Sequence, residues 1–107
     1  MTISIQDFSE IDLRVAEIKA VEEHPNADKL LVLKIDTGDG EKQLVAGIKN
    51  HYSAEELIGR KIIVVNNLAP VVLRGVESQG MLLAARDDDK VVFLTTEKDV
   101  KPGSRVQ

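Results

Sequence analysis

The sequence predicts an all-β domain that folds into one small barrel. Its apolar residues fall in short runs, and turn-forming residues such as Pro25, Gly38 and Pro70 separate these runs. Only one short segment, residues 53–59, has the pattern of a helix. Short apolar runs with regular turn signals are typical of β-barrels and β-sandwiches. A chain of 107 residues is long enough for one domain with a single core and too short for two.

The first strand is expected to be long and bent. Residues 11–15 alternate between apolar and polar side chains, as a half-buried strand does. The phase then changes, because Ile18 and Val21 do not simply continue the odd-numbered register. A β-bulge near Ala16-Glu17 would insert one unpaired residue and coil the strand. A bent first strand suits a small closed barrel better than a flat sheet.

The next two strands are predicted to form a hairpin. His24-Pro25 interrupts the first strand, because proline has no N–H and biases the residue before it away from helix. Residues 30–36 and 42–48 are predicted as the second and third strands. Thr37-Gly38-Asp39-Gly40 is the tight turn that joins them.

The helix and the later strands complete the chain. Ser53 and Glu56 have the spacing of a capping box, and Gly59 is placed to end the helix. At about two turns, this helix is stable only when packed on the barrel. Three further strands are predicted at residues 62–65, 80–85 and 91–95. The acidic run Asp87-Asp88-Asp89 forms the turn between the last two.

This order of elements indicates a particular barrel. A single short helix between the third and fourth strands suggests the OB-fold, which binds oligonucleotides and oligosaccharides. We therefore predict a five-stranded OB-fold Greek-key barrel with one short helix between strands 3 and 4 and extra C-terminal strand segments. Residues 1–10 lead into the barrel, with Phe8 as the expected anchor.

The composition is that of a globular protein in a reducing compartment. The chain has no cysteine, so it has no disulfide, no thiolate metal site and no thiol nucleophile. No apolar run approaches the ~20 residues of a membrane span. The N-terminus lacks the basic start and long apolar core of a signal peptide. We expect a cytoplasmic location.

No set of residues has the spacing of a catalytic or metal site. His24 and His51 lie outside the H-x-x-x-H and H-E-x-x-H patterns, so His24 is interpreted as a turn residue. The chain lacks a G-x-S-x-G elbow and a Walker-type phosphate loop. Asp87-Asp88-Asp89 is interpreted as a solvated hairpin tip, with a cation site as the alternative. We expect no enzymatic activity, no metal and no cofactor.

The positions of the charged residues favour nucleic-acid binding more than the net charge of the chain does. Fourteen Lys and Arg against eighteen Asp and Glu give a net charge of −4, which argues against a generic DNA or RNA coat protein. An acidic body can still carry a local basic face. Basic residues lie on or beside the early strands and loops: Lys29, Lys34, Lys42, Lys49 and Arg74. They line one side if the barrel closes as predicted; the alternative is that they only solvate the surface.

The scarcity of aromatic side chains narrows the choice of nucleic acid. The chain has three: Phe8, Tyr52 and Phe93. Single-strand-binding OB-folds stack bases on aromatic platforms, so a structured RNA is the better candidate, read by shape, phosphates and 2′-hydroxyls. Side chains that can supply hydrogen bonds to it are Asn26, Ser78 and Gln79. Met81 can make an adaptable apolar contact with an exposed base.

Several predicted strands are apolar on both faces. These are residues 30–33, 62–65 and 80–85. A small barrel has one interior, so the remaining apolar groups indicate a second buried surface. A symmetric homodimer is the commonest solution. The alternative is that the helix and the N-terminal segment cover those faces.

Six segments of the chain, in family order, resemble the tRNA-binding domain family. They are Asp12–Val15, His24–Leu31, Val45–Ile48, Tyr52–Gly59, Asn67–Pro70 and Leu73–Ala85. HPNADKL (the first motif, residues 24–30) and LRGVxSxGM (the second motif, residues 73–81) are the specific ones. This OB-fold module stands at the C-terminus of many methionyl-tRNA synthetases and also occurs as a free-standing tRNA-binding protein. The resemblance covers residues 7–107 and leaves residues 1–6 as an N-terminal lead-in.

The resemblance implies a non-catalytic homodimer that binds the outer corner of L-shaped tRNA and does not read the anticodon. It implies either the C-terminal dimerising domain of methionyl-tRNA synthetase or a free-standing homologue that acts in trans. In both settings the module raises tRNA affinity. The residues that it assigns to tRNA contact are Asn26, Lys29, Lys42, Arg74, Ser78 and Met81.

One position departs from the family pattern. The family usually has basic residues just after the proline that matches Pro70, where this chain has Val71-Val72. The loss of two cations there should weaken phosphate attraction and flatten its salt dependence.

A protein-interaction or chaperone-like module is the alternative function. In that case the apolar outer face of the OB-fold would bind a partner chain. A secretion-chaperone-like branch shares the fold but differs in its counterpart of the first motif, which places this chain with the tRNA-binding group.

Overall fold

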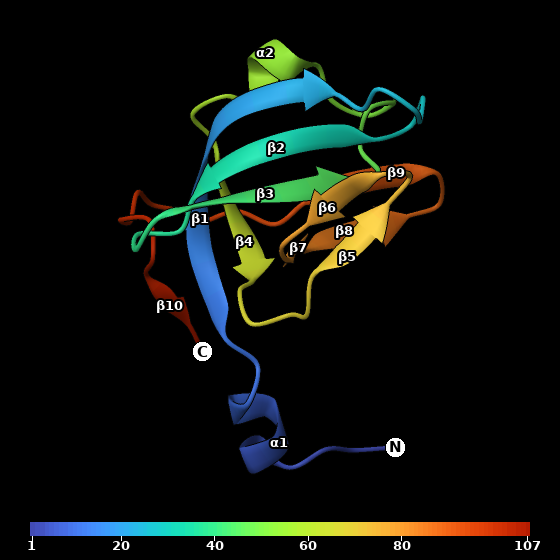
Figure 1. Cartoon of the computed structure of the whole chain (residues 1–107). Helices are drawn as coiled ribbons and strands as arrows, with labels where there is room; N and C mark the ends of the chain where they lie inside the picture. Colours follow the sequence, from blue (N-terminus) through green and yellow to red (C-terminus); the bar gives the residue numbers. More distant parts are fainter.

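Five strands in the order β3-β2-β1-β4-β7 form the main path of a six-stranded sheet, which makes up most of the structure, a computed structural model that describes residues 1–107 (Figure 1). These strands are β1 (Leu13–Glu23), β2 (Leu31–Asp36), β3 (Glu41–Ala46), β4 (Lys61–Val65) and β7 (Met81–Leu82). β1, β2 and β3 follow one another as antiparallel neighbours, and β4 returns to lie beside β1, which is the Greek-key order. The predicted all-β barrel with five strands is confirmed.

Hydrogen bonds across the gap between β3 and β7 nearly close the barrel. The backbone N–H of Gln79 donates to the Gln43 carbonyl at 2.8 Å, and the N–H of Val45 donates to the Ser78 hydroxyl at 3.0 Å. Gly80 is packed tightly between β4 and β3, because a Cβ there would lie 2.9 Å from the carbonyl oxygen of Val65 and 3.2 Å from the side chain of Leu44. Its φ of 152° also disfavours any other residue.

The bend in β1 occurs later than predicted. The register between β1 and β2 shifts between Ile18 and Ala20, whereas the expected bulge was near Ala16-Glu17. The change of apolar phase at residue 16 has another cause. Ala16 and Ile18 face the core of the barrel, while Val15 is buried on the opposite face. The carbonyl of Ser104 accepts the N–H of Val15 at 2.9 Å, so the C-terminal segment pairs with the edge of β1 before the pairing with β2 begins.

Alternate residues of the middle strands fill the barrel. Leu31, Leu33 and Ile35 of β2 point inward, and Ile62 and Val64 of β4 meet them in one buried cluster. The other face of β4 is also buried: Ile63 and Val65, which lie across from Val15 and Leu13 of β1, are 7% and 9% exposed. β10 (Arg105–Val106) pairs with the start of β1. Part of the predicted second buried surface therefore lies within one chain.

Two small hairpins stand beside the main sheet. β8 (Ala84–Asp87) and β9 (Lys90–Phe93) meet at the acidic turn, as expected, but the predicted strand 80–85 is divided between β7 and β8. β5 (Val71–Leu73) and β6 (Val76–Ser78) form a hairpin that the sequence did not predict. Its turn residues Arg74 and Gly75 both have positive φ, 54° and 90°, as a type I′ turn requires.

The helices are short. α2 (Ala54–Leu57) lies between β3 and β4 and has the predicted capping box of Ser53 and Glu56, although it is a single turn of four residues. Its Leu57 is fully buried in the core. α1 (Ile5–Ser9) was not predicted; Ser4 caps it, it buries no residue, and it stands away from the barrel in Figure 1. Neither helix is long and apolar enough to cross a membrane.

The contact between two turns gives a test of how the C-terminal segment is held. Gly38 and Gly103 pack backbone to backbone, and a Cβ on Gly103 would lie 2.8 Å from the carbonyl oxygen of Thr37. Gly59 has nearly the same φ, 86° against 89°, but faces open space. We expect Gly59→Ala to lower the free energy of unfolding by about 1 kcal/mol and Gly103→Ala by about 3 kcal/mol, because only the second adds a clash to the backbone strain. Urea unfolding measures both; equal losses would contradict the account of this contact.

Candidate functional site

The first and second motifs meet through a buried histidine. The Nε2 of His24 lies 2.9 Å from the carbonyl oxygen of Leu73, and its Nδ1 accepts the N–H of Asn26 at 2.9 Å. Because Nδ1 accepts, the neutral ring carries its proton on Nε2 and donates it to Leu73. The side chain is only 6% exposed and both nitrogens are engaged. His24 therefore fastens the loop after β1 to the β5–β6 hairpin.

Asn26 and Arg74 join the same loops at the surface. The Nδ2 of Asn26 donates to the carbonyl oxygen of Arg74 at 3.3 Å, and the Nη2 of Arg74 donates to the carbonyl oxygen of Asn26 at 3.4 Å. Both residues are exposed. We call these contacts among His24, Asn26, Leu73 and Arg74 the loop clasp. Two motifs 48 residues apart thus form one continuous surface.

Lys29, in the first motif, is a second exposed cation besides Arg74. Its side chain is exposed and forms no ion pair or hydrogen bond, while its carbonyl accepts the N–H of Lys49 at 3.4 Å. Lys49 itself pairs with Glu23 at 2.9 Å. Among these neighbouring lysines, Lys29 is the one whose ammonium remains available to an anion.

Lys42 and Ser78 are engaged within the protein. The ammonium of Lys42 donates to the backbone carbonyl and the side-chain oxygen of Asn66, at 2.8 and 2.9 Å. Ser78 is 2% exposed, and its hydroxyl accepts from Val45 and donates to Gly80. Ser78 lies at the closure of the barrel and presents no free polar atom to a ligand. Lys42 retains one free N–H.

The ion pair between Arg14 and Asp12 helps to fix Asn66, the residue that Lys42 contacts. Arg14 donates to the Asp12 carboxylate, and this hydrogen bond holds the pKa of Asp12 below its usual value. Asn66 also donates to that carboxylate at 3.3 Å, and so lies between Asp12 and Lys42. These hydrogen bonds connect Arg14 to Lys42 through Asp12 and Asn66 and hold the Lys42 ammonium in place. They lie outside the loop clasp.

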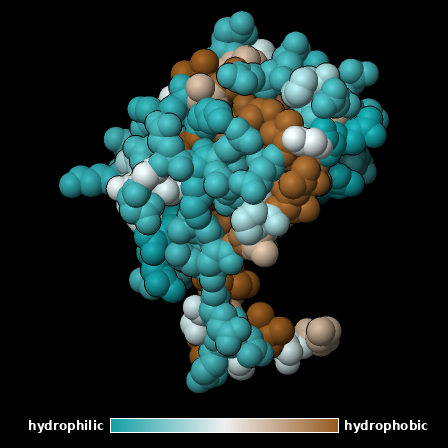
Figure 2. Space-filling model, in the orientation of Figure 1, coloured by the Kyte–Doolittle hydropathy of each residue, from teal (hydrophilic) through white to brown (hydrophobic).

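Apolar side chains are exposed on β5 and β7. Met81 of β7 is 48% exposed, and Val71 and Val72 of β5 are 49% and 64% exposed. In Figure 2, hydrophobic atoms gather over the β5–β6 hairpin and the neighbouring end of β3, beside a largely hydrophilic face. The valines that stand where the family usually has basic residues are therefore on the surface next to Arg74, where the cations would have been.

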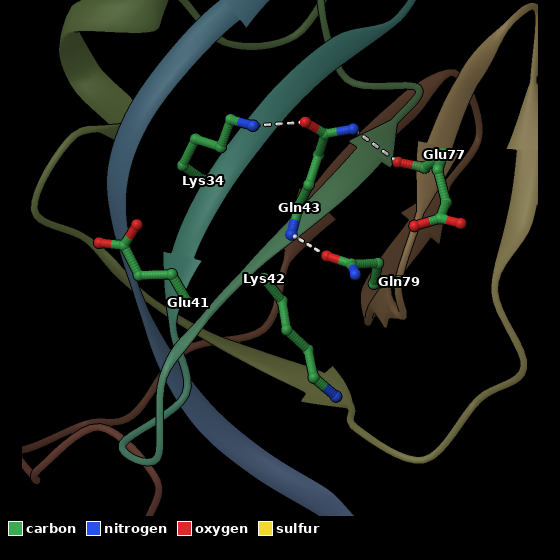
Figure 3. Close-up of a pocket in the computed structure, with 6 residues that line it drawn as sticks. All are labelled: Lys34, Glu41, Lys42, Gln43, Glu77 and Gln79. Atoms are coloured by element: carbon green, nitrogen blue, oxygen red, sulfur yellow. Dashed lines mark hydrogen bonds between the residues drawn. The ribbon is translucent and has the colours of Figure 1, made fainter.

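The structure also brings together polar residues that the sequence did not group. Six side chains from β2, β3 and the segment at the end of β6 line a shallow hollow of about 260 Å³, which we call the polar hollow: Lys34, Glu41, Lys42, Gln43, Glu77 and Gln79 (Figure 3). Of these, the sequence had singled out Lys34 and Lys42 as basic and Gln79 as a donor. The strand register opposes Lys34 and Gln43, which only the correct pairing of β2 with β3 could have revealed.

Comparisons with known proteins find relatives that match nearly the whole chain. Residues 13–105 match the family described as a putative tRNA binding domain. The chain is 53% identical over 105 residues to methionine–tRNA ligase of Pyrococcus furiosus, covering 98% of this chain and 14% of the ligase. It is 51% identical over 104 residues to the ligase of Caldanaerobacter subterraneus, covering 97% of this chain and 16% of the ligase. The chain thus spans about one-seventh of the length of these relatives.

Two solved structures have the same fold along the whole chain. A MetRS-related protein from Pyrococcus horikoshii superposes with a TM-score of 0.93 at 36% identity, covering 100% of this chain and 99% of that one. The chaperone CsaA of Bacillus anthracis superposes with a TM-score of 0.90 at 30% identity, covering both chains completely.

Proposed function

Because the chain belongs to the tRNA-binding domain family, we propose that it is a non-catalytic module that recognises the shape of tRNA at the outer corner of the L. The observation that carries this proposal is the loop clasp, which joins the two family motifs into one exposed surface. Structured RNA is read mainly through shape, phosphates and 2′-hydroxyls, which a surface without aromatic platforms can contact.

The exposed residues of the two motifs divide the contacts. Lys29 and Arg74 attract phosphates, since both carry cations that no carboxylate neutralises. Asn26 offers its side-chain oxygen as an acceptor, because its amide nitrogen already donates to Arg74. Met81 makes an apolar contact with an exposed base. Lys42 contributes its one free N–H, and Ser78 supports the surface from beneath by holding β6 against β3.

The two valines of β5 limit the electrostatic part of the affinity. Val71 and Val72 are exposed beside Arg74 and carry no charge. Each phosphate contact adds about one to the slope of log K against log salt, so this surface has a shallower slope than a version with two more cations. We expect modest affinity, suited to a module that acts together with a synthetase.

The setting that we propose is protein synthesis in the cytoplasm. The relatives are named methionine–tRNA ligases, and this chain matches only 14–16% of their length. In such a ligase the module raises the affinity for tRNA and dimerises the enzyme, while the remaining part carries the chemistry. A free-standing homologue would supply the same affinity in trans. No cofactor is needed in either case.

A homodimer completes the proposal. α1 buries none of its residues. Two large apolar side chains of the N-terminal segment, Ile3 before α1 and Ile5 within it, are 63% and 72% exposed. An apolar hollow lies between α1 and the C-terminus, lined in part by Phe8, Ile11 and Val106. Exposed apolar groups of this kind mark interaction surfaces. We infer that the N-terminal segment packs against a second copy of the chain.

A chaperone-like function is the second candidate. The match to the chaperone CsaA covers the full length of both chains, and hydrophobic atoms are exposed over the β5–β6 hairpin (Figure 2). A partner polypeptide bound at this surface would remain bound at high salt and after RNase treatment. Loss of all recovered partners under those conditions favours tRNA as the ligand.

The salt dependence of tRNA binding tests the proposed surface. We expect wild-type protein to bind unfractionated tRNA with an affinity that falls as salt rises. In the Lys29→Ala/Arg74→Ala variant, the slope of log K against log salt should fall by about two, one for each lost phosphate contact. Fluorescence anisotropy over a salt series measures the slope.

A matched variant separates a local effect from one of net charge. Lys98→Ala/Lys101→Ala removes two exposed cations from the C-terminal segment, away from both motifs. Its slope should remain close to that of the wild type. Equal slopes for both double variants, or no salt-dependent binding by the wild type, would rule out the surface.

The oligomeric state tests the N-terminal interface. We expect sedimentation equilibrium to give twice the mass of one chain, and Ile3→Asp/Ile5→Asp to give the mass of a monomer, because a buried unpaired charge opposes association. The control Val92→Asp places one aspartate at an apolar residue of β9 that is 48% exposed, and it should leave the dimer intact. A monomeric wild type would end the proposal of a homodimer, and a dimeric double variant would end that of the interface.

A further inference from the structure

The polar hollow lies on the same hairpin as the loop clasp but has a different chemistry. Arg74 is at the tip of the β5–β6 hairpin, whereas Glu77 and Gln79 lie at its base, against the outer face of β2 and β3 (Figure 3). None of the six residues that line the hollow is hydrophobic. Its volume of about 260 Å³ is below the ~300–1,000 Å³ of pockets that enclose a drug-sized ligand.

Hydrogen bonds fix the floor of the hollow. The side-chain oxygen of Gln43 accepts from Lys34, and its Nε2 donates to the carbonyl oxygen of Glu77 at 2.8 Å. The side-chain oxygen of Gln79 accepts the N–H of Gln43 at 2.9 Å. Both carboxamides are therefore held in one orientation, with the oxygen of Gln79 turned toward β3 and its amide nitrogen turned away (Figure 3).

Two residues that line the hollow, Glu77 and Gln79, keep an acceptor and a donor free. The Nε2 of Gln79 has no hydrogen-bond partner in the protein, and neither has the carboxylate of Glu77, which is exposed. Lys34 uses one of its three N–H groups on Gln43 and keeps the others. A ligand group that both donates and accepts hydrogen bonds would satisfy these atoms.

The charge and the lining narrow that ligand to a sugar. The lining carries two cations, Lys34 and Lys42, and two carboxylates, Glu41 and Glu77, so the hollow has no net charge to attract a phosphate. It offers no aromatic or aliphatic platform on which a base could stack. Ribose is neutral, and its 2′-hydroxyl is both a donor and an acceptor.

We propose that the polar hollow binds a ribose of the bound tRNA, with the 2′-hydroxyl donating to Glu77 and accepting from Gln79. This site rests on the proposed tRNA-binding function and adds to it a contact that carries no phosphate. It lets the domain distinguish RNA from DNA independently of Lys29 and Arg74, because only RNA has the 2′-hydroxyl.

Removal of the Glu77 carboxylate tests the proposal, because the two interpretations of Glu77 predict different changes in tRNA affinity. If Glu77 is only a solvated carboxylate, Glu77→Ala removes a negative charge near RNA and should leave tRNA binding unchanged or strengthen it. The ribose contact instead predicts binding about tenfold weaker, the loss of one hydrogen bond to a charged acceptor. The salt slope should not decrease, since no phosphate contact is lost. Glu97→Ala makes the same charge change at an exposed residue outside the hollow and should not weaken binding.

A modified RNA identifies the partner of Glu77. A tRNA transcript with 2′-fluoro groups retains the A-form geometry but lacks the hydroxyl donor. Wild type and Glu77→Ala should bind this transcript equally. The inference is overturned if Glu77→Ala binds unmodified tRNA as tightly as the wild type, or if its loss is the same for both RNAs. Either result leaves the salt dependence of Lys29 and Arg74 intact, so the proposed function would survive, whereas a wild type that binds no tRNA overturns both.

Discussion

The imidazole of His24 makes the contacts on which the arrangement of the proposed binding surface depends. It is a side chain from the loop after β1, and it reaches a carbonyl 49 residues later in the chain while also accepting an N–H from its own loop. A buried polar group that loses its partner costs ~1–3 kcal/mol, so the two loops hold each other in place. Asn26 and Arg74 face solvent side by side because this buried pair of hydrogen bonds lies behind them.

The β5–β6 hairpin is consequently held at both ends. Its tip is fastened by the loop clasp, and its base by Ser78 and Gln79, which bond to β3. A hairpin of two three-residue strands would be only marginally stable by itself. Anchored in this way, it presents a cation at one end and a neutral polar hollow at the other. The recognition of RNA by shape that we propose requires such groups to stay at fixed separations, and a braced hairpin beside the barrel meets this requirement.

The sequence predicted the features that depend on neighbouring residues. The alternation at residues 11–15 and the capping box at Ser53 could be read locally, and the family motifs indicated which residues to examine. The features that it missed depend on contacts between distant segments. The bulge in β1 was predicted too early because β1 buries residues on both faces, Ala16 and Ile18 on one and Val15 on the other. The β5–β6 hairpin was missed because Arg74-Gly75 is not one of the usual signals for a tight turn. The burial of Ser78 could not be foreseen, since a serine shows its partners only in the folded chain.

The most direct test of the account is the tRNA affinity of His24→Ala, a variant of a buried residue that touches no RNA. It should be measured at a temperature where circular dichroism shows the variant to be folded. If the loop clasp positions the surface, the affinity for tRNA should fall about as far as in Arg74→Ala, and adding the second substitution should cause little further loss. A folded His24→Ala protein that binds tRNA like the wild type would contradict the claim that the clasp creates the binding surface.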